Sequence, residues 1–236
     1  MGENRPLRDE IRACVRHHLE TQKSLVMGQC LTAVGWVGGT LPELYEDSGM
    51  IELSMADVAG AGFAVGAALA GTKPIFVIRY QGFNWFNAPI ILNYACKSKE
   101  LWGRSCSMFI RSIAMEGGIG PVAGSSHHSL YARMPGVKIY SPMTSTEYRR
   151  IYTQFLKENE VYYVSEHRGA FGFDGALPDS SRKNPQLTIV AISITRFAAL
   201  EAQRILDDQG VNVNLVNLVD LKPLGLSNHC YFLFRS

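Results

Sequence analysis

The stretch IELSMADVAGAGFAVGAALAG, residues 51–71, decides how this 236-residue chain folds. It contains a short apolar segment, a single acid at Asp57, and then a helical segment rich in glycine and alanine. Each glycine in a helix costs about 1 kcal/mol relative to alanine. Several are tolerated where another backbone or a ligand must approach closely. Asp57 is therefore either a charge that suits the N-terminus of a helix or a functional carboxylate.

The segments on both sides of this stretch alternate between apolar runs and amphipathic runs, which predict strands and helices. Strands are expected over 24–27, 74–79, 108–113, 137–141, 161–164, 187–192 and 211–219. Helices are expected over 6–21, 145–157 and 197–209, with Ser145 as a cap and a helical turn over 41–45. This alternation predicts an α/β fold with a parallel sheet flanked by helices.

A segment dense in glycine, proline and serine, residues 169–186, is typical of a linker. It divides the chain into a first domain over 1–168 and a second, partial domain over 187–236. The second domain opens with one strand–helix–strand unit.

Composition excludes several classes of function. The 23 basic and 21 acidic residues give a net charge of +2, which offers no argument for a nucleic-acid or membrane partner. The five cysteines are scattered without a CxxC pair, so we expect reduced cytoplasmic thiols and no metal site. The N-terminus has no apolar signal core, and no run of about 18 apolar residues would span a membrane.

Three candidate groups each follow a predicted strand. They are Asp57, the aromatic cluster that starts at Phe83, and the adjacent histidines His127 and His128 in a small-residue loop. Ligands of parallel α/β sheets bind at the carboxyl ends of the strands, so these groups could converge. Phe83 is either a core aromatic or a platform for a flat ligand. The histidines are either ordinary loop residues or functional ones.

A second histidine pair, His17 and His18, lies on the predicted first helix. We expect both of these side chains at the surface.

Several segments, in this order, resemble the beta subunit of the first component of 2-oxo-acid dehydrogenases. More broadly, they resemble the pyrimidine-binding domain of the transketolase superfamily. They are MGQCLTAVGWVGGT (27–40), GAGFAVGAALAGTKPI (60–75), RMPGVKIYSPMTSTEYRRI (133–151) and LTIVAISITRFAALEAQRILDDQGVNVNLVNLVDLKPL (187–224). The resemblance covers roughly residues 5 to 225.

The resemblance implies a thiamine-diphosphate-binding fold and a role in oxidative decarboxylation of a 2-oxo acid. It assigns catalytic roles to Asp57 and to His128, with the choice between the two loop histidines left open. Asp57 takes the place of a family Glu that hydrogen-bonds the aminopyrimidine ring. The cofactor-binding positions that the resemblance implies are Gly28, Gln29, Asp57, Phe83 and His127.

The chain also departs from the family pattern. Asp57 is one methylene shorter than the family Glu, a difference of about 1.5 Å. Gln29 and Cys30 stand where the family carries Glu and Asp, and the histidine loop is shorter. The end of the chain, GLSNHCYFLFRS (225–236), does not resemble the family, so we expect a truncation or a change of reading frame.

The family's diphosphate-and-magnesium motif is absent. The resemblance therefore implies that an alpha-type subunit supplies the diphosphate site and the magnesium ligands, in a heterotetramer that could also contact a lipoyl acyltransferase core. The compartment would be the cytoplasm, or the mitochondrial matrix in a eukaryote, although no clear transit peptide is present.

Three alternatives stay open at this point. The spacing Gly60–Gly66 is loosely similar to a dinucleotide-binding turn. A non-catalytic, partner-binding relative could keep the fold without the proton chemistry. Half of a split transketolase or deoxyxylulose-phosphate synthase is also compatible with the segments above.

Overall fold

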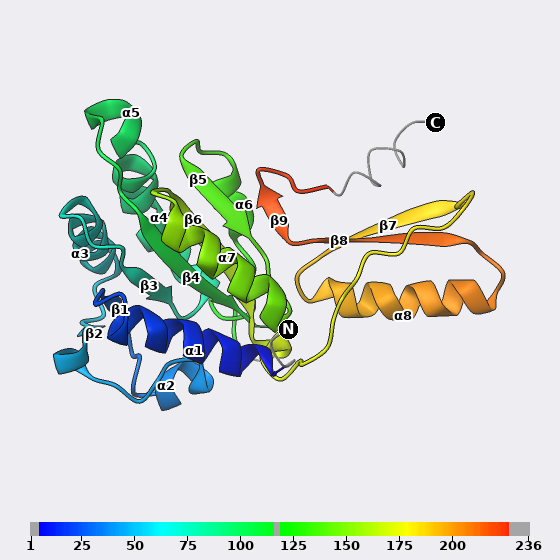
Figure 1. Ribbon diagram of the computed structural model, residues 1–236, viewed down its shortest axis with the longest axis horizontal. Coiled ribbons are helices and arrows are strands. Elements are labelled where there is room, and N and C mark those ends of the chain that lie inside the picture. Colours follow the sequence, from blue (N-terminus) through cyan, green and yellow to red (C-terminus); the bar gives the residue numbers. More distant parts are fainter. Residues whose placement is uncertain (1–4, 116–118, 227–236) are drawn as a thin grey trace.

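The computed structural model describes residues 5–115 and 119–226, and a seven-stranded sheet forms its centre (Figure 1). The strand order is β2-β1-β3-β4-β6-β5-β9. The first six strands are parallel, and β9 is antiparallel to β5. The strands are β1 (Val26–Gln29), β2 (Met50–Leu53), β3 (Ile75–Ile78), β4 (Met108–Ala114), β5 (Val137–Tyr140), β6 (Val161–His167) and β9 (Asp220–Lys222).

Helices cover both faces of this sheet, which confirms the predicted α/β fold. On one face, α1 (Leu7–Glu20) and α7 (Ser145–Lys157) bury their apolar sides against the strands. The opposite face is covered by α3 (Asp57–Leu69), α4 (Asn84–Ile90), the π-helical turn η3 (Ile91–Ala95) and α6 (His128–Ala132). The short helix α5 (Ser98–Trp102) follows η3. Two clusters of buried apolar residues, one on each face, form the core.

Helix α7 has the predicted bounds, Ser145–Lys157, but its capping residue lies one position before the predicted one. Thr144 is the cap, not Ser145, because its Oγ1 accepts a hydrogen bond from the Glu147 backbone N–H at 3.2 Å. The Glu147 carboxylate in turn accepts from the Thr144 backbone N–H at 3.1 Å. A threonine and a glutamate three residues apart satisfy two free helix donors at once, which a serine at the next position could not do in this register.

The helical turn predicted over 41–45 is not present. A 3-10 turn, η1 (Glu46–Ser48), comes after that position, and the turn α2 (Gly35–Gly39) comes before it. In α2 all five residues have positive φ, including Trp36 at φ 49° and Val37 at φ 52°. A left-handed turn costs roughly 1–2 kcal/mol for each residue with a Cβ, so neighbouring contacts must hold it.

His18 also differs from its prediction, whereas His17 is exposed as expected. The His18 side chain is completely buried. Its Nε2 lies 2.7 Å from the Lys73 carbonyl oxygen, and its Nδ1 lies 3.2 Å from the Tyr152 hydroxyl. Burial lowers the pKa of His18 to about 4. It is therefore a neutral core residue that joins α1 to α7.

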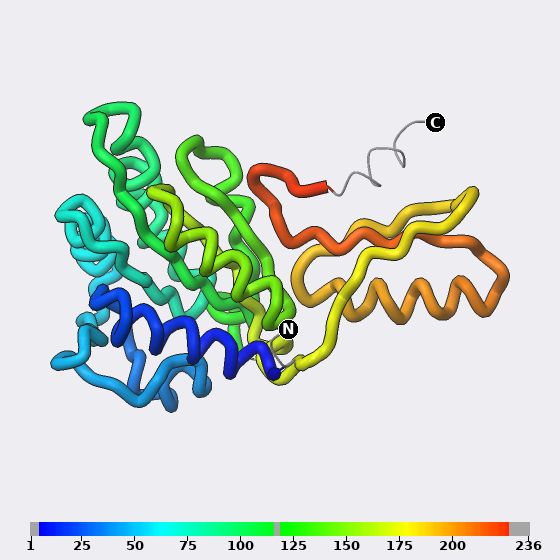
Figure 2. The backbone as a smooth tube through the Cα atoms, viewed as in Figure 1, coloured from blue at the N-terminus to red at the C-terminus, as the bar shows by residue number. Residues whose placement is uncertain are grey.

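A second unit follows the main sheet. It consists of β7 (Leu187–Ile192), α8 (Thr195–Asp208) and β8 (Val213–Leu218), with β7 and β8 parallel in a sheet of their own. The predicted strand–helix–strand unit is therefore confirmed. The segment predicted as a linker runs along this unit in Figure 2, and Ser180 pairs with Leu215 through two backbone hydrogen bonds. The division at 168 and 187 stays a prediction, and residues 227–236 of the predicted truncated end lie outside the described residues.

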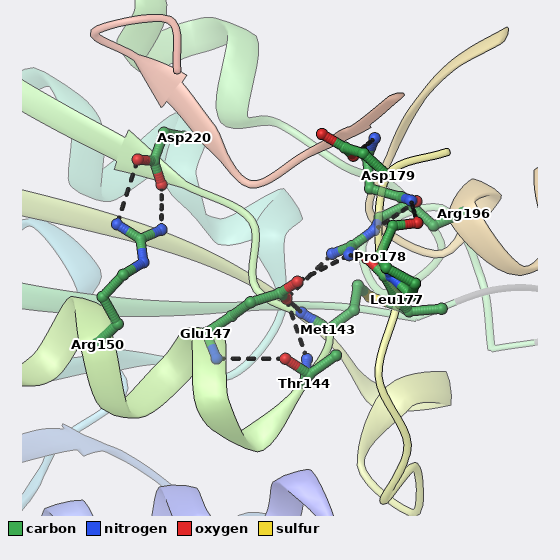
Figure 3. A network of polar contacts seen from close by, with 10 residues as sticks. Met143, Thr144, Glu147, Arg150, Leu177, Pro178, Asp179, Arg196 and Asp220 are labelled. Carbon is green, nitrogen blue, oxygen red and sulfur yellow. Dashed lines mark hydrogen bonds and ion pairs between the residues drawn. The ribbon is translucent and has the colours of Figure 1, made fainter. Parts of the chain in front are cut away.

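The two units meet through a set of polar contacts that we call the Arg196 clamp, formed by Arg196, Glu147 and Asn217. Figure 3 shows Arg196 directed toward Glu147. The fully buried Arg196 guanidinium donates to both oxygens of the Glu147 carboxylate, at 2.7 and 3.0 Å. Its Nε donates to the Asn217 side-chain oxygen at 3.1 Å. Beside it, Arg150 on α7 pairs with Asp220, where the chain returns to the main sheet as β9.

Within residues 5–115 and 119–226, no helix has both the length and the apolar composition needed to cross a membrane.

Candidate functional site

A small pocket, partly open to solvent, lies at the carboxyl ends of β1 and β3, against the starts of α3 and α4. We call it the Asp57 pocket. It brings together three of the residues that the sequence singled out, Gln29, Asp57 and Phe83. The other lining residues are Cys30, Met55, Phe76, Val77, Ile78, Arg79 and Asn87. The predicted convergence therefore holds for Asp57 and Phe83, whereas His127 and His128 do not line this pocket; Gln29 joins it as a position that only the family resemblance had indicated.

Asp57 is the first residue of α3, and its half-buried side chain is oriented by Asn87. The Asn87 side-chain N–H donates to Asp57 Oδ1 at 2.9 Å and to the Phe83 carbonyl oxygen at 2.9 Å. In the part of the chain that the structure describes, the carboxylate accepts no other hydrogen bond, and the buried Asn87 Oδ1 has no partner. The Asp57 carboxylate therefore has hydrogen-bonding capacity to spare at the pocket, whereas Asn87 Oδ1 is enclosed by the protein.

Asn87 was not predicted from the sequence. It lies on α4, four residues after Phe83, so one helical turn brings both of them to the same side of the pocket. The spacing of Phe83 and Asn87 after a predicted strand is the only signal in the sequence that could have indicated it.

Gly28 does not line the Asp57 pocket. It lies in β1, where a Cβ would come within 2.7 Å of the Val77 carbonyl oxygen on β3. Its role in this structure is the close approach of two strands. The turn after β1 is held by Glu52, whose carboxylate accepts from the backbone N–H groups of Leu31 at 2.9 Å and Thr32 at 3.1 Å. Glu52 was also missed, since nothing in its pattern distinguishes it from a surface acid.

The loop histidines lie beside the Asp57 pocket and do not line it. The His127 ring packs edge-on against Trp85 at 5.7 Å between centroids, and its Nε2 lies 2.9 Å from Ser125 Oγ. His128 Nδ1 lies 3.0 Å from Ser126 Oγ. Burial lowers the pKa of both histidines, and for His128 the neighbouring His127 adds to this effect. Both rings are therefore neutral near pH 7.

A buried polar network connects this histidine loop to the sheet. Gln81 Oε1 accepts from the His127 backbone N–H at 2.7 Å, and Gln81 Nε2 donates to the Ser165 hydroxyl at 2.8 Å. Asn84 donates to the Tyr163 hydroxyl at 3.0 Å and accepts from the Tyr131 hydroxyl at 3.1 Å. Gln81, Asn84, Tyr131, Tyr163 and Ser165 are all buried. Satisfied buried networks of this kind fix a loop in one arrangement.

The glycine spacing Gly60–Gly66 does not form a dinucleotide-binding turn. All of it lies inside α3, which starts at Asp57, whereas a phosphate-binding turn would have to precede the helix. The described residues also contain no group of three or more His, Cys, Asp or Glu side chains that could hold a metal ion.

Two known proteins resemble this chain in sequence. The chain is 26% identical over 211 residues to the acetoin:2,6-dichlorophenolindophenol oxidoreductase subunit beta of Cupriavidus necator, covering 82% of this chain and 62% of that protein. It is 27% identical over 203 residues to the mitochondrial pyruvate dehydrogenase E1 component subunit beta of Bos taurus, covering 77% and 56%. The chain thus spans about three fifths of the length of these relatives.

Among solved structures, a split gene transketolase described as an inactive beta4 tetramer is similar, with a TM-score of 0.68 and 18% identity over 94% of this chain and 74% of that one. This likeness concerns the fold alone. A family model described as "Transketolase, pyrimidine binding domain" matches residues 8–172, which include every residue of the Asp57 pocket. The chain therefore belongs to the transketolase pyrimidine-binding domain family.

Proposed function

We propose that this chain is a beta-type subunit of a thiamine-diphosphate-dependent 2-oxo-acid dehydrogenase and supplies the aminopyrimidine half of the cofactor site. The observation that carries the proposal is the Asp57 carboxylate, which Asn87 orients in a pocket shared with Phe83. Beta subunits of such enzymes are among the relatives, and the pocket lies within the segment that matches the family.

The pocket residues fit an aminopyrimidine ring by their chemistry. Such a ring needs an acceptor for a ring N–H, and the Asp57 carboxylate is an acceptor with free capacity. The Phe83 side chain offers a flat apolar surface beside it. When bound, thiamine diphosphate supplies the nucleophilic carbon and the electron sink for decarboxylation.

In this proposal the Asp57 side chain controls the proton on a ring nitrogen of the aminopyrimidine. With thiamine diphosphate bound, the Asp57 carboxylate would accept a hydrogen bond from a ring nitrogen of the aminopyrimidine and would hold a proton at that atom. Asn87 acts on Asp57 by restricting its rotation, and so is a positioning residue. On the β1 side of the proposed cofactor site, Gln29 lines the pocket, and Gly28 contributes only by letting β1 and β3 approach closely.

The roles of the loop histidines belong to the same proposal. His128 is the proposed catalytic histidine and His127 the proposed cofactor contact. Gln81 supports these roles because it fixes the His127 backbone to β6 through Ser165. A neutral imidazole near pH 7 is able to accept a proton from substrate.

An alpha-type partner would complete the site. Large apolar side chains are exposed around the Asp57 pocket, including Met55 at 70%, Phe63 at 66% and Trp85 at 61%. Exposed apolar surface of this size is typical of a protein interface. The partner would supply the diphosphate site and the magnesium ligands, in a heterotetramer, with contact to a lipoyl acyltransferase core as a further proposal. The compartment proposed is the cytoplasm, or the mitochondrial matrix in a eukaryote.

Calorimetry of thiamine diphosphate and magnesium tests this proposal, first with the chain alone and then with a candidate alpha subunit. We expect binding only in the mixture. In the mixture, Asp57→Asn should lower the decarboxylation rate by on the order of a hundredfold, because an amide has no negative charge to hold a proton on the ring nitrogen. The exposed Asp174→Asn serves as the matched control and should leave the rate unchanged. Unchanged turnover in Asp57→Asn would contradict the role of this carboxylate.

A second candidate, a non-catalytic relative that binds the same partner, is favoured by one observation: neither loop histidine lines the Asp57 pocket. A complex that forms without binding the cofactor would support this candidate. A third candidate is that the chain is half of a split transketolase or deoxyxylulose-phosphate synthase, since a split transketolase has the same fold. Turnover of a ketose phosphate in place of a 2-oxo acid would identify it.

A further inference from the structure

Helix α6 (His128–Ala132) is a short helical segment that carries one of the loop histidines at its start. A helix of this length is not stable by itself in water, because few of its backbone groups are paired within the helix. In the described residues, no side-chain hydrogen bond caps its N-terminus. The arrangement of α6, and with it the place of His128, therefore depends on contacts with other parts of the fold.

Contacts from the sheet side hold the front and the middle of this segment. Gln81 accepts a hydrogen bond from the His127 backbone N–H at 2.7 Å. The buried Tyr131 donates to Asn84 at 3.1 Å, and its ring stacks on Tyr163 with 4.1 Å between centroids. None of these contacts reaches the C-terminal carbonyl groups of α6, which a short helix leaves without partners of its own.

Lys222 supplies the contact at the C-terminal end of α6. It lies on β9, 90 residues after Ala132 in the chain, and its Nζ donates to the Ala132 carbonyl oxygen at 3.2 Å. The same Nζ also donates to the Met134 carbonyl oxygen. Figure 1 shows β9 beside α6. An ammonium group suits this position, because the last carbonyl groups of a helix carry partial negative charge.

Strand β9 is itself fixed to the main sheet from several sides. Its backbone pairs with β5, and Asp220 forms an ion pair with Arg150 on α7. Leu221 packs against the apolar cluster on the face of the sheet that α6 covers. Since β9 follows β8 directly, the second unit ends in a strand whose side chain reaches the histidine loop. The placement of the second unit and that of α6 are therefore connected through Lys222.

We propose that Lys222 is a positioning residue for the histidine loop: its ammonium group caps α6 and so holds His128 in one orientation. This inference rests on the proposed function, in which His128 is the catalytic histidine. Lys222 does not line the Asp57 pocket and acts only through the carbonyl groups at the end of α6. The strand that follows the second unit thereby takes part in building the site.

Hydrogen exchange of the full-length chain, followed by mass spectrometry, tests the contact without cofactor or partner. Lys222→Met removes the ammonium group and keeps an unbranched side chain, whereas Lys222→Arg keeps a cation. The control Lys157→Met removes an exposed ammonium group at the C-terminal end of α7. We expect residues 128–134 to exchange at least about tenfold faster in Lys222→Met. Lys222→Arg and the control should exchange there like wild type, and α1 should be unchanged in every variant.

The variants of Lys222 should fold, because this side chain is only partly buried and belongs to a strand at the edge of the sheet. Their melting temperatures check this. Lys222→Gln, whose side chain is shorter and uncharged, removes the contact in a second way should Lys222→Met fail to fold. The inference is overturned if residues 128–134 keep the wild-type exchange rate without the cation. It is also overturned if Lys222→Arg exchanges as fast as Lys222→Met, or if α1 is accelerated to the same degree.

Kinetics in the mixture with a candidate alpha subunit test the positioning role. Lys222→Met should lower kcat at least about tenfold and leave KM and the affinity for thiamine diphosphate unchanged, because a catalytic group misplaced by about 1 Å loses rate and not binding. Lys222→Arg should keep most of the rate, which a general loss of stability would not explain.

The outcomes for Lys222 and for the proposed function can be told apart. A wild-type kcat in Lys222→Met, in a mixture where His128→Gln is inactive, would refute the inference alone. Faster exchange of residues 128–134 in Lys222→Met, without any binding of thiamine diphosphate by the wild-type mixture, would refute the proposed function and leave the cap on α6 standing.

Discussion

The main sheet and the second unit are built from the same kinds of element, but they are held together in different ways. The main sheet buries apolar residues on both faces. The second unit has a small apolar cluster centred on Ala191, Ala199 and Leu215, and its strand β7 leaves Val190 42% exposed. Ile194, Phe197 and Leu200 of the second unit pack against the core of the first, and the Arg196 clamp adds charged hydrogen bonds to this contact. The comparison indicates that most of the free energy of unfolding comes from the main sheet and that contact with the main sheet stabilises the second unit.

The largest effect should come from the buried ion pair of the main sheet. Arg111→Met leaves the Glu166 carboxylate buried without its cation, so the free energy of unfolding should fall by about 3–5 kcal/mol. Urea denaturation measures this loss. In the double variant Arg111→Met/Glu166→Met, most of the loss should be recovered because no buried charge remains. A loss below about 1 kcal/mol in the single variant would show that this ion pair contributes no more than a surface pair, and would contradict its stabilising role in the main sheet.

The next effect is a loss of stability at acidic pH, caused by His18. The pKa of His18 in the fold is about 4, below its ordinary value of 6.5, so the folded state favours the neutral ring. The stability that depends on the neutral ring is complete above pH 6.5 and is lost as the pH falls toward 4. The free energy of unfolding should decrease by about 3 kcal/mol over this range. His18→Gln should show a flatter profile, and identical profiles for both proteins would contradict this account.

A smaller effect is expected at the clamp. Arg196→Met removes the charged hydrogen bonds to Glu147 and should lower stability by about 2 kcal/mol. The second unit should then open before the main sheet, so limited proteolysis should cut first within residues 173–186. Arg204→Met is the control, since Arg204 pairs with exposed acids on the same helix and should change nothing measurable. A single transition with unchanged proteolysis in Arg196→Met would show that the clamp does not couple the units.

The smallest effect concerns the cap of α7. Thr144→Ala should cost about 1 kcal/mol in thermal or urea denaturation. Ser145→Ala, one residue later, should cost little because its hydroxyl does not cap the helix. Glu147 takes part in both the cap and the clamp, so Thr144→Ala should also increase cleavage between the units slightly. Equal losses in the two variants would place the cap at Ser145 after all.

The sequence predicted the elements well where periodicity and strand propensity agree. The βαβ units, the parallel sheet and the convergence of Asp57 and Phe83 all followed from local patterns. It failed where the tertiary structure overrides local preference. No local rule predicts a left-handed turn that contains Trp36 and Val37, because only the Thr40 and Arg111 contacts make it tolerable.

Partners in distant segments explain the other misses. Asn87 acquires its role from Asp57, thirty residues earlier in the chain, and Gln81 from Ser165 on β6. His18 was placed at the surface because a polar residue next to another histidine looks solvated, yet its partners Lys73 and Tyr152 lie far along the chain. The roles of the loop histidines stay predictions, as does the division into domains.

The antiparallel strand β9 has a consequence for synthesis of the chain. It pairs with β5 at Ile139 and Tyr140, about eighty residues before it. Until residues 220–222 leave the ribosome, the backbone groups on that side of β5 have no strand partner. An open edge of this kind can pair with a neighbouring chain. The nascent protein is therefore most exposed to aggregation while the second unit is being translated, and slow codons in that segment would lengthen the period of risk.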